Sequence, residues 1–352
     1  MSVLIAILTL VLAVVSVHAE PFAARFLVSL EGDEGTVHPV ALAGRSLLVG
    51  IGSEYGYARV LDADTGAERV VLTCPTFPSD DPTCPSSCGN AVAASPRMLA
   101  VGAADRVHLF DLGGRYRRSL NAGIRARHSL AARGNRVLVG SYDAVHLFAA
   151  RSGRAIRAFD DPDPAAQLSF GAAVALVGRT VVVGAPGTGS PLVPGTAGRV
   201  YGFDLRTGAL LWMRGNPDDP AGETHAGRYF GWQVAQVGRD ALVGPAAYRL
   251  HARTGEVVQV YADPDGGPSG PSWFGGALAA SGNRVAIGDA AFGPRGAVHV
   301  YEADSGALVE TIEPDDSFLG DGAGRFVALH RRYAATTSSS YSGAPRLLGF
   351  VR

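Results

Sequence analysis

Three cysteines lie close together in the stretch TCPTFPSDDPTCPSSC, at Cys74, Cys84 and Cys88. Thiols at this spacing form either a disulfide or part of a metal site, and zinc sites with cysteine ligands usually add further cysteines or a histidine. The stretch holds no histidine and no C-x-x-C pair. We therefore predict one short-range disulfide, either Cys74–Cys84 or Cys74–Cys88, with one thiol left over.

Three histidines occupy one slot of a repeated segment, as V-H-L-F at His108 and His146 and as V-H-V-Y at His299. Imidazole nitrogens are good zinc ligands, so a recurring histidine raises the question of a metal. Equivalent positions of a repeat lie on different structural units, however, and tyrosine fills the same slot at Tyr201 and Tyr248. We predict that these histidines pack between strands and bind no metal.

Patterns typical of catalysis are missing from the sequence. It has no G-x-S-x-G turn to present a nucleophilic serine, and no G-x-G-x-x-G run that opens a helix. We therefore name no catalytic, cofactor-binding or metal residue. Enzymatic activity stays open, and the pattern favours a binding role.

Aspartates gather in the connections between the repeats. Carboxylates there attract a basic or cationic partner, although Asp-Pro pairs also initiate turns and charged turns keep a surface soluble. The candidate binding residues form an acidic rim: Asp160, Asp161, Asp163, Asp218, Asp219, Asp263, Asp265, Asp315 and Asp316.

The first residues, MSVLIAILTLVLAVVSVHAE, resemble a secretory signal peptide. The apolar run Val3–Val17 is shorter than the roughly 20 residues that usually span a bilayer. Small residues precede the expected cleavage point after Ala19. We predict a signal peptide over residues 1–19, a mature chain without a membrane span, and secretion or a periplasmic or cell-surface location.

The charge balance excludes one class of partner. The formal net charge is −1, from 31 basic and 32 acidic residues, whereas nucleic-acid-binding proteins usually carry a basic excess. We therefore expect no nucleic acid as a partner. The oligomeric state stays open.

The chain repeats one hairpin. FGAAVALVGRTVVVGAP from Phe170 returns as FGWQVAQVGRDALVGP from Phe230 and as FGGALAASGNRVAIGD from Phe274. Each copy is followed by two further apolar runs, several of them joined by a T-G or S-G doublet, which is a hairpin signal. Units of about 40–50 residues with four strands, here called a to d, predict a β-propeller.

Seven such units fit the chain, and the last one ends at PRLLGFVR (345–352) without a fourth strand. The stretch Arg25–Leu30, before the first unit, can supply that strand and remove the exposed edges of an open sheet. We predict an all-β, seven-bladed propeller of four-stranded blades, closed by its N-terminal strand. It forms a single domain over residues 20–352.

The segments FG-x-x-V-A, V-V-V-G-A-P and G-R-V-Y-x-F-D, clearest from Phe170 to Gly275, resemble the FG-GAP repeat of integrin α heads and secreted bacterial proteins. The resemblance implies a seven-bladed ring with calcium loops between strands a and b. Here the turns at 177–180 and 281–284 are too short for five or six oxygen ligands. We therefore do not carry that calcium site over, and calcium elsewhere stays open.

The segments LDADTGAER (61–69) and FDLRTGALLW (203–212) also resemble the repeat of quinone-dependent dehydrogenases and their non-catalytic scaffold relatives. In that family a tryptophan after the T-G turn docks onto the next blade. Trp212 occupies this place, and Val71, Ala158 and Val309 or nearby aliphatic residues are expected to stand in elsewhere.

Alternating strand direction gives the propeller two faces. The d–a face carries the b–c and d–a connections, with the variable loops and the acidic rim; the a–b face carries the a–b and c–d turns, with an arginine in every a–b turn. Function usually resides in variable loops. We predict an exported, non-enzymatic scaffold that binds or adheres to an extracellular protein or cell-surface ligand through the d–a face. A quinone-dependent dehydrogenase or other propeller enzyme, and a purely structural envelope component, are the alternatives.

Overall fold

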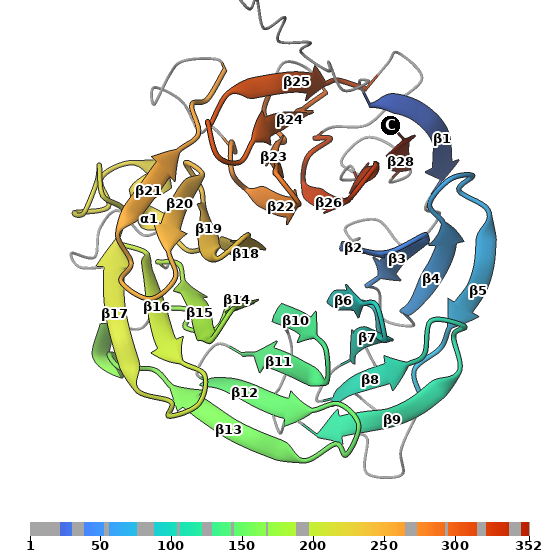
Figure 1. The fold of residues 1–352 in the computed structure, drawn as a ribbon, viewed down its shortest axis with the longest axis horizontal. Coiled ribbons are helices and arrows are strands. Elements are labelled where there is room, and N and C mark those ends of the chain that lie inside the picture. The colour runs from blue at the N-terminus through green and yellow to red at the C-terminus, as the bar shows by residue number, and fades with distance from the viewer. Residues whose placement is uncertain are drawn as a thin grey trace, which may run out of the picture.

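The computed structural model describes residues 22–29, 39–52, 56–75, 88–103, 106–121, 129–141, 144–166, 168–187, 197–264, 273–292, 295–314, 322–337 and 346–351 of the 352-residue chain. Within these residues the chain forms seven antiparallel sheets of four strands each, arranged in a ring around a central axis (Figure 1). The predicted all-β, seven-bladed propeller is confirmed.

Each blade runs from strand a at the axis to strand d at the rim (Figure 1). Blades 1 to 3 are β2(Val40–Ala43), β3(Ser46–Ile51), β4(Tyr57–Asp62), β5(Glu68–Leu72); β6(Val92–Ser95), β7(Met98–Ala103), β8(Arg106–Phe110), β9(Tyr116–Asn121); and β10(Ser129–Arg133), β11(Arg136–Gly140), β12(Ala144–Ala149), β13(Ala155–Asp160). Blades 4 to 6 are β14(Ala173–Val177), β15(Thr180–Ala185), β16(Arg199–Asp204), β17(Leu210–Gly215); β18(Gln233–Val237), β19(Asp240–Gly244), β20(Tyr248–His251), β21(Val257–Val260); and β22(Ala277–Ser281), β23(Arg284–Asp289), β24(Ala297–Glu302), β25(Leu308–Ile312). Blade 7 is β26(Phe326–His330), β27(Tyr333–Thr337), β28(Arg346–Val351) and β1(Ala23–Ser29).

Strands from the two ends of the chain share blade 7. β1 runs antiparallel to β28, with Ala23 opposite Val351 and Ser29 opposite Arg346. Just before β1, Phe22 is buried between blades 6 and 7, and its N–H lies 3.1 Å from each carboxylate oxygen of Glu310 on β25. We expected Arg25–Leu30 in this place, and the strand spans Ala23–Ser29.

Two-residue turns join strands a and b. In blade 4 Val177 pairs with Thr180 across Gly178 and Arg179. Gly178 has a φ of +59°, a conformation that glycine adopts without steric cost. The turn has no room for a calcium-binding loop, as its length in the sequence indicates.

The hydrophobic core is divided among the junctions between blades. Seven clusters of buried apolar side chains lie one between each pair of neighbouring blades. The phenylalanine of each FG motif contributes to them: Phe170 meets the Tyr201 ring edge-on at 5.4 Å, and Phe230 meets Tyr248 at 5.8 Å. Each blade therefore packs against both of its neighbours.

The repeated glycines bring the main chains of neighbouring blades together. A Cβ on Gly184, at the end of strand b in blade 4, would lie 1.9 Å from the carbonyl oxygen of Gly231 in blade 5. A Cβ on Gly244 would lie 1.9 Å from the oxygen of Gly275. The same approach recurs at Gly50 with Gly89, Gly140 with Gly171, and Gly288 with Gly324. The FG and V-V-V-G motifs thus encode a contact between blades.

Among the described residues, two short helical turns lie on d–a connections, where we expected none: η1(Pro164–Ala166) and α1(His225–Arg228). Local hydrogen bonds explain α1, because Thr224 Oγ1 accepts the N–H of Gly227 at 3.1 Å and Thr224 O accepts that of Arg228 at 3.1 Å. Threonine is a favoured cap at a helix start. No helix among the described residues is long and apolar enough to cross a membrane.

Candidate functional site

The first group of candidate acids follows β13 on the d–a face. Asp163 Oδ2 lies 2.5 Å from Arg199 Nη1 in an ion pair, and Asp161 Oδ1 accepts the N–H of Asp163 at 2.9 Å. Asp160 pairs with Ala144 at the end of β13, and its exposed carboxylate forms no hydrogen bond or ion pair with any residue that the structure describes. Of this group, Asp160 therefore presents the most accessible charge.

The second group lies between β17 and β18 and holds its own loop in place. Tyr248 donates a hydrogen bond from its hydroxyl to Asp218, and burial together with this carboxylate raises the pKa of Tyr248. Asp219 accepts the N–H groups of Glu223 and Thr224 at 3.0 and 2.7 Å. Burial alone would raise the pKa of Asp219, but these bonds outweigh it and the pKa is lowered. Both carboxylates thus stabilise the loop.

The remaining candidate acids belong to other connections of the chain. Asp263 is partly buried, and Asp265, Asp315 and Asp316 lie outside the described residues. The described histidines, cysteines and acids include no group of three or more that could hold a metal ion. The carboxylates therefore spread over separate connections of the d–a face.

Exposed aromatic rings lie on the same face, and the sequence pattern did not mark them as functional. Trp232 and Trp273 are each 41% exposed, although tryptophan is usually well buried. Trp232 follows the Phe230-Gly231 turn of blade 5, and its ring meets that of Tyr229 edge-on at 5.9 Å. Trp273 precedes the corresponding turn of blade 6.

The sequence carries a signal for the first of these rings, Trp232. The slot of Trp232 is filled by Ala172 in blade 4 and by Gly276 in blade 6. Blade 5 thus has a large aromatic residue where two other blades have a small one, and the packing of the blades does not require this difference. Comparison of the repeats position by position would have found it.

The disulfide joins Cys74, just after β5, to Cys88, with an S–S distance of 2.04 Å. This is one of the two predicted pairings, and Cys84 lies outside the described residues. Cys88 is fully buried, and Cys88-Gly89 takes the place of the Phe-Gly pair in blade 2, since the N–H of Gly89 donates to Gly102 O at 2.9 Å. The bond therefore ties a d–a connection to blade 2.

The three histidines lie on strand c of different blades. Two of them share a hydrogen bond with a hydroxyl on strand d of their own blade. His108 Nδ1 lies 2.8 Å from the hydroxyl of Ser119, and His299 Nδ1 lies 3.0 Å from that of Thr311. Burial lowers the pKa of His146, and the charge of Asp160 opposes this shift. The arrangement is that of packing residues with polar tips.

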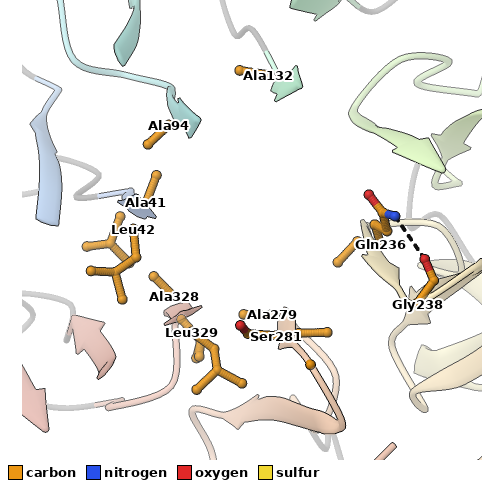
Figure 2. Close-up of a pocket in the computed structure, with 15 residues that line it drawn as sticks. Ala41, Leu42, Ala94, Ala132, Gln236, Gly238, Ala279, Ser281, Ala328 and Leu329 are labelled. Atoms are coloured by element: carbon orange, nitrogen blue, oxygen red, sulfur yellow. Dashed lines mark hydrogen bonds between the residues drawn. The ribbon is translucent and has the colours of Figure 1, made fainter. Parts of the chain in front are cut away.

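A cavity of about 520 Å³ lies on the axis, toward the a–b face (Figure 2). Figure 2 shows Ala41, Leu42, Ala94, Ala132 and Gln236 around it, each from an inner strand. Ala279, Ser281, Ala328 and Leu329 complete much of the wall. The lining side chains are therefore mostly small and apolar, while main-chain groups, Gln236 and Ser281 make much of the exposed wall polar; the mouth is bordered by the a–b turns.

Trp212 docks onto the next blade. Its indole Nε1 donates to Ala252 O in blade 5 at 2.8 Å, and a Cβ on Gly255 would lie 2.7 Å from its ring. In other blades the same slot is filled by different side chains, which lie opposite the third residue from the end of strand c, or the second in blade 2. They are Val70, Arg118, Arg157, Gln259 and Glu310.

The three named stand-ins for Trp212 lie one residue from the slot, whereas in blade 1 the slot is filled by a nearby aliphatic residue, Val70, as the alternative expectation had it. Val71 and Val309 are exposed on the rim, and Ala158 pairs with His146 outside the slot. A β-bulge explains this offset of one residue. In blades 1, 3 and 6 the register between strands c and d shifts just after the T-G or S-G turn, as it does in blade 4 between Gly202 and Phe203. A bulge changes which side chains face the neighbouring blade.

Residues 55–237 match the model of a PQQ-type repeat family, described as outer membrane protein assembly factor BamB. The match supports the resemblance to quinoprotein repeats, and it does not show the FG-GAP family. No curated protein matches the chain.

Among solved structures, the crystal structure of the computationally designed Ika8 protein is similar to this chain. The two are 18% identical with a TM-score of 0.55, over 91% of this chain and 98% of the designed one. At this identity the likeness shows the fold alone.

Proposed function

The chain belongs to the PQQ-type repeat family described as outer membrane protein assembly factor BamB, and on this premise we propose that it is an exported, non-enzymatic scaffold that binds a partner protein. The family description concerns assembly at the outer membrane, so the proposal places the chain in the cell envelope or on its surface. The disulfide between Cys74 and Cys88 supports export, because cytosolic thiols are kept reduced.

The observation that carries the binding role is the pair of exposed tryptophans, Trp232 and Trp273, on neighbouring blades of the d–a face. Tryptophan and tyrosine are enriched among the residues that dominate binding energy at protein interfaces. Both rings are held at turns packed against the rigid ring of blades, which lowers the entropy lost on binding. The pair is therefore the proposed centre of the docking surface.

The acidic rim adds a preference for a basic partner surface. Asp160 is the described carboxylate that contributes most, because Asp161, Asp163, Asp218 and Asp219 are held by local bonds. Such charges act mainly on the association rate and its salt dependence. The proposed partner therefore presents an apolar or aromatic patch flanked by basic side chains.

Site-specific photo-crosslinking in intact cells tests this proposal. A photoreactive residue replaces Trp232, and in a control protein it replaces Val258, an exposed valine on the rim strand β21. The proposal predicts a discrete crosslinked adduct from position 232 that position 258 does not give. Equal adducts from both positions, or none from either, would contradict it.

A spectroscopic experiment separates this function from the enzymatic alternative. Purified protein is incubated with quinone cofactor and calcium, and its absorption and dye-reducing activity are recorded. The scaffold proposal predicts neither a bound chromophore nor dye reduction. A bound quinone that reduces dye would replace the proposal with a dehydrogenase.

A further inference from the structure

The axial cavity has a regular construction. The second residue of a V-A or L-A pair in strand a is alanine in every blade: Ala41, Ala93, Ala131, Ala175, Ala235, Ala279 and Ala328; of these, Ala41, Ala235, Ala279 and Ala328 line the cavity. The next position varies in size, with Leu42, Leu176 and Leu329 in three blades, Ala94, Ala132 and Ala280 in three others and Gln236 in the seventh; all of these except Leu176 line the cavity. The alanines that line the cavity leave space beside Leu42 and Leu329, and the cavity volume lies within the range of about 300–1,000 Å³ that ligand pockets span.

The walls of the cavity also offer main-chain hydrogen-bonding groups. Each inner strand is the end strand of its sheet and pairs only with strand b. Along the axis its other edge therefore presents N–H and C=O groups that pair with no described strand. A buried acyl chain would leave these groups unsatisfied at a free-energy cost, whereas a peptide pairs with them through its own backbone.

Arginines surround the mouth of the cavity. Eight of them lie on the a–b turns or on the first residue of strand b: Arg45, Arg97, Arg136, Arg179, Arg239, Arg284, Arg331 and Arg332. Those turns contain no acid, and Asp240, which begins β19, is buried and paired with Arg249 at 2.8 Å. A ring of like charge around a low-dielectric opening concentrates its field on that opening.

Most of this charge is not neutralised by ion pairs. Arg45 and Arg332 both pair with Asp64 on a c–d turn, at 2.8 and 3.0 Å. Within the part of the chain that the structure describes, no ion pair is formed by Arg97, Arg136, Arg179, Arg239 or Arg284.

We propose that the a–b mouth of the axial cavity is a second binding site, which takes a short acidic peptide segment of a partner protein. The carboxylates of the peptide meet the arginines, its backbone pairs with the inner strands, and an apolar side chain fills the space beside Ala94 and Ala132. The site lies on the face opposite Trp232 and Trp273, so it can be tested separately from the docking surface proposed above.

Fluorescence anisotropy with defined peptides tests the site. The probes are a labelled peptide that alternates glutamate with leucine, the same peptide with lysine for glutamate, and one with glycine for leucine. We expect the glutamate–leucine peptide to bind, the lysine peptide not to bind, and the affinity to fall as salt rises, since exposed charges are screened within about 8–10 Å.

Two pairs of variants assign the contacts. Replacing Arg136→Gln and Arg239→Gln together should weaken the glutamate–leucine peptide by about three- to tenfold, while Arg214→Gln with Arg228→Gln on the other face should leave its affinity unchanged. Ala132→Leu fills part of the cavity with a leucine, which is the residue that blades 1, 4 and 7 carry at the same slot. It should weaken the leucine-containing peptide and spare the glycine version, and Ala158→Leu on the rim is its control.

Four outcomes would overturn the proposal. They are failure of the glutamate–leucine peptide to bind the parent protein, equal binding of the lysine peptide, unchanged affinity in the double arginine variant, and displacement of the peptide by oleate at lower concentration than by unlabelled peptide. The last would assign the cavity to an anionic lipid. Circular dichroism confirms that each variant keeps its fold before its affinity is interpreted.

Discussion

The contacts between glycines explain why the sequence repeats as it does. At five described junctions the strand-b glycine of one blade lies against the main chain of the turn that begins the next, and the space for a Cβ is already occupied by a carbonyl oxygen. The turn glycines have φ values near +90°, as at Gly171 and Gly231. A side chain at either position is therefore excluded by the neighbouring backbone or by the turn itself.

Replacing Gly184 with alanine should force blades 4 and 5 apart. Overpacking of this kind destabilises a protein by about 1–3 kcal/mol or more, and the midpoint of urea unfolding should fall accordingly. The control is Gly215→Ala on β17, where the nearest atom to an added Cβ is 3.8 Å away. Equal stability of the two variants would show that the junction relaxes without cost.

The aspartate of the D-x-x-T-G turn organises the c–d hairpin. Asp204 Oδ1 accepts the N–H and the hydroxyl of Thr207 at 2.8 and 3.0 Å and the N–H of Arg206 at 3.0 Å. The hydrogen bonds from Thr207, followed by that from Arg206, hold the pKa of Asp204 below its usual value. Asp62 makes the same contacts with Thr65 in blade 1.

The lowered pKa of Asp204 predicts a loss of stability in acid. Because the folded pKa lies below the unfolded one, the carboxylate contributes stability above about pH 4, and this contribution is lost as the pH falls through the folded pKa. Asp204→Asn should lower the melting temperature by a few degrees at pH 7 and make stability less dependent on pH below about pH 4. Thermal unfolding from pH 7 to pH 2 measures both effects, and parallel curves for variant and parent would contradict them.

At the scale of elements, strand d carries the link from one blade to the next. The slot filled by Trp212 places its side chain against the T-G turn of the following blade. Arg157 does the same in blade 3, where its Nη2 donates to Arg206 O at 2.9 Å. One position thus serves as an apolar anchor in one blade and a polar one in another.

Trp212→Ala should destabilise the propeller by about 3–5 kcal/mol, as expected for a buried aromatic side chain. Trp232→Ala is the matched control, because that ring is exposed and its removal should change stability by less than about 0.5 kcal/mol. Chemical unfolding followed by far-UV circular dichroism compares the two. A similar loss in both variants would mean that Trp232 is a structural residue and would weaken its assignment to the docking surface.

The elements show where prediction from sequence succeeds and where it stops. Strand order, blade number and the short a–b turns follow from periodicity and from glycine positions, because these are local properties of the chain. The docking slot was misplaced by one residue, since a bulge after the T-G turn leaves no mark in the alternation of apolar residues. The roles of Asp163 and Asp218 could not be predicted either, because their partners Arg199 and Tyr248 lie about 30 or more positions away in the chain.

At the scale of the whole molecule, blade 7 has its four strands only if the two ends of the chain meet. β28 would be the outer strand of blade 7 without β1, with a free row of N–H and C=O groups along its edge. Phe22 adds an apolar contact between blades 6 and 7 and a hydrogen bond to Glu310. β1 therefore joins the ends of the chain both by pairing and by packing.

A truncated protein that begins at Leu30 tests this closure against a control that begins at Glu20. We expect the truncation to lower stability by more than about 2 kcal/mol through the loss of the Phe22 side chain alone, and to cause self-association through the free edge of β28. Thermal unfolding and sedimentation velocity measure the two effects. A synthetic peptide with the sequence of residues 20–30, added in trans, should restore both stability and the monomer if the defect is the missing strand. If the truncated chain is monomeric and as stable as the control, the ring does not depend on β1, and the edge of β28 is protected in another way.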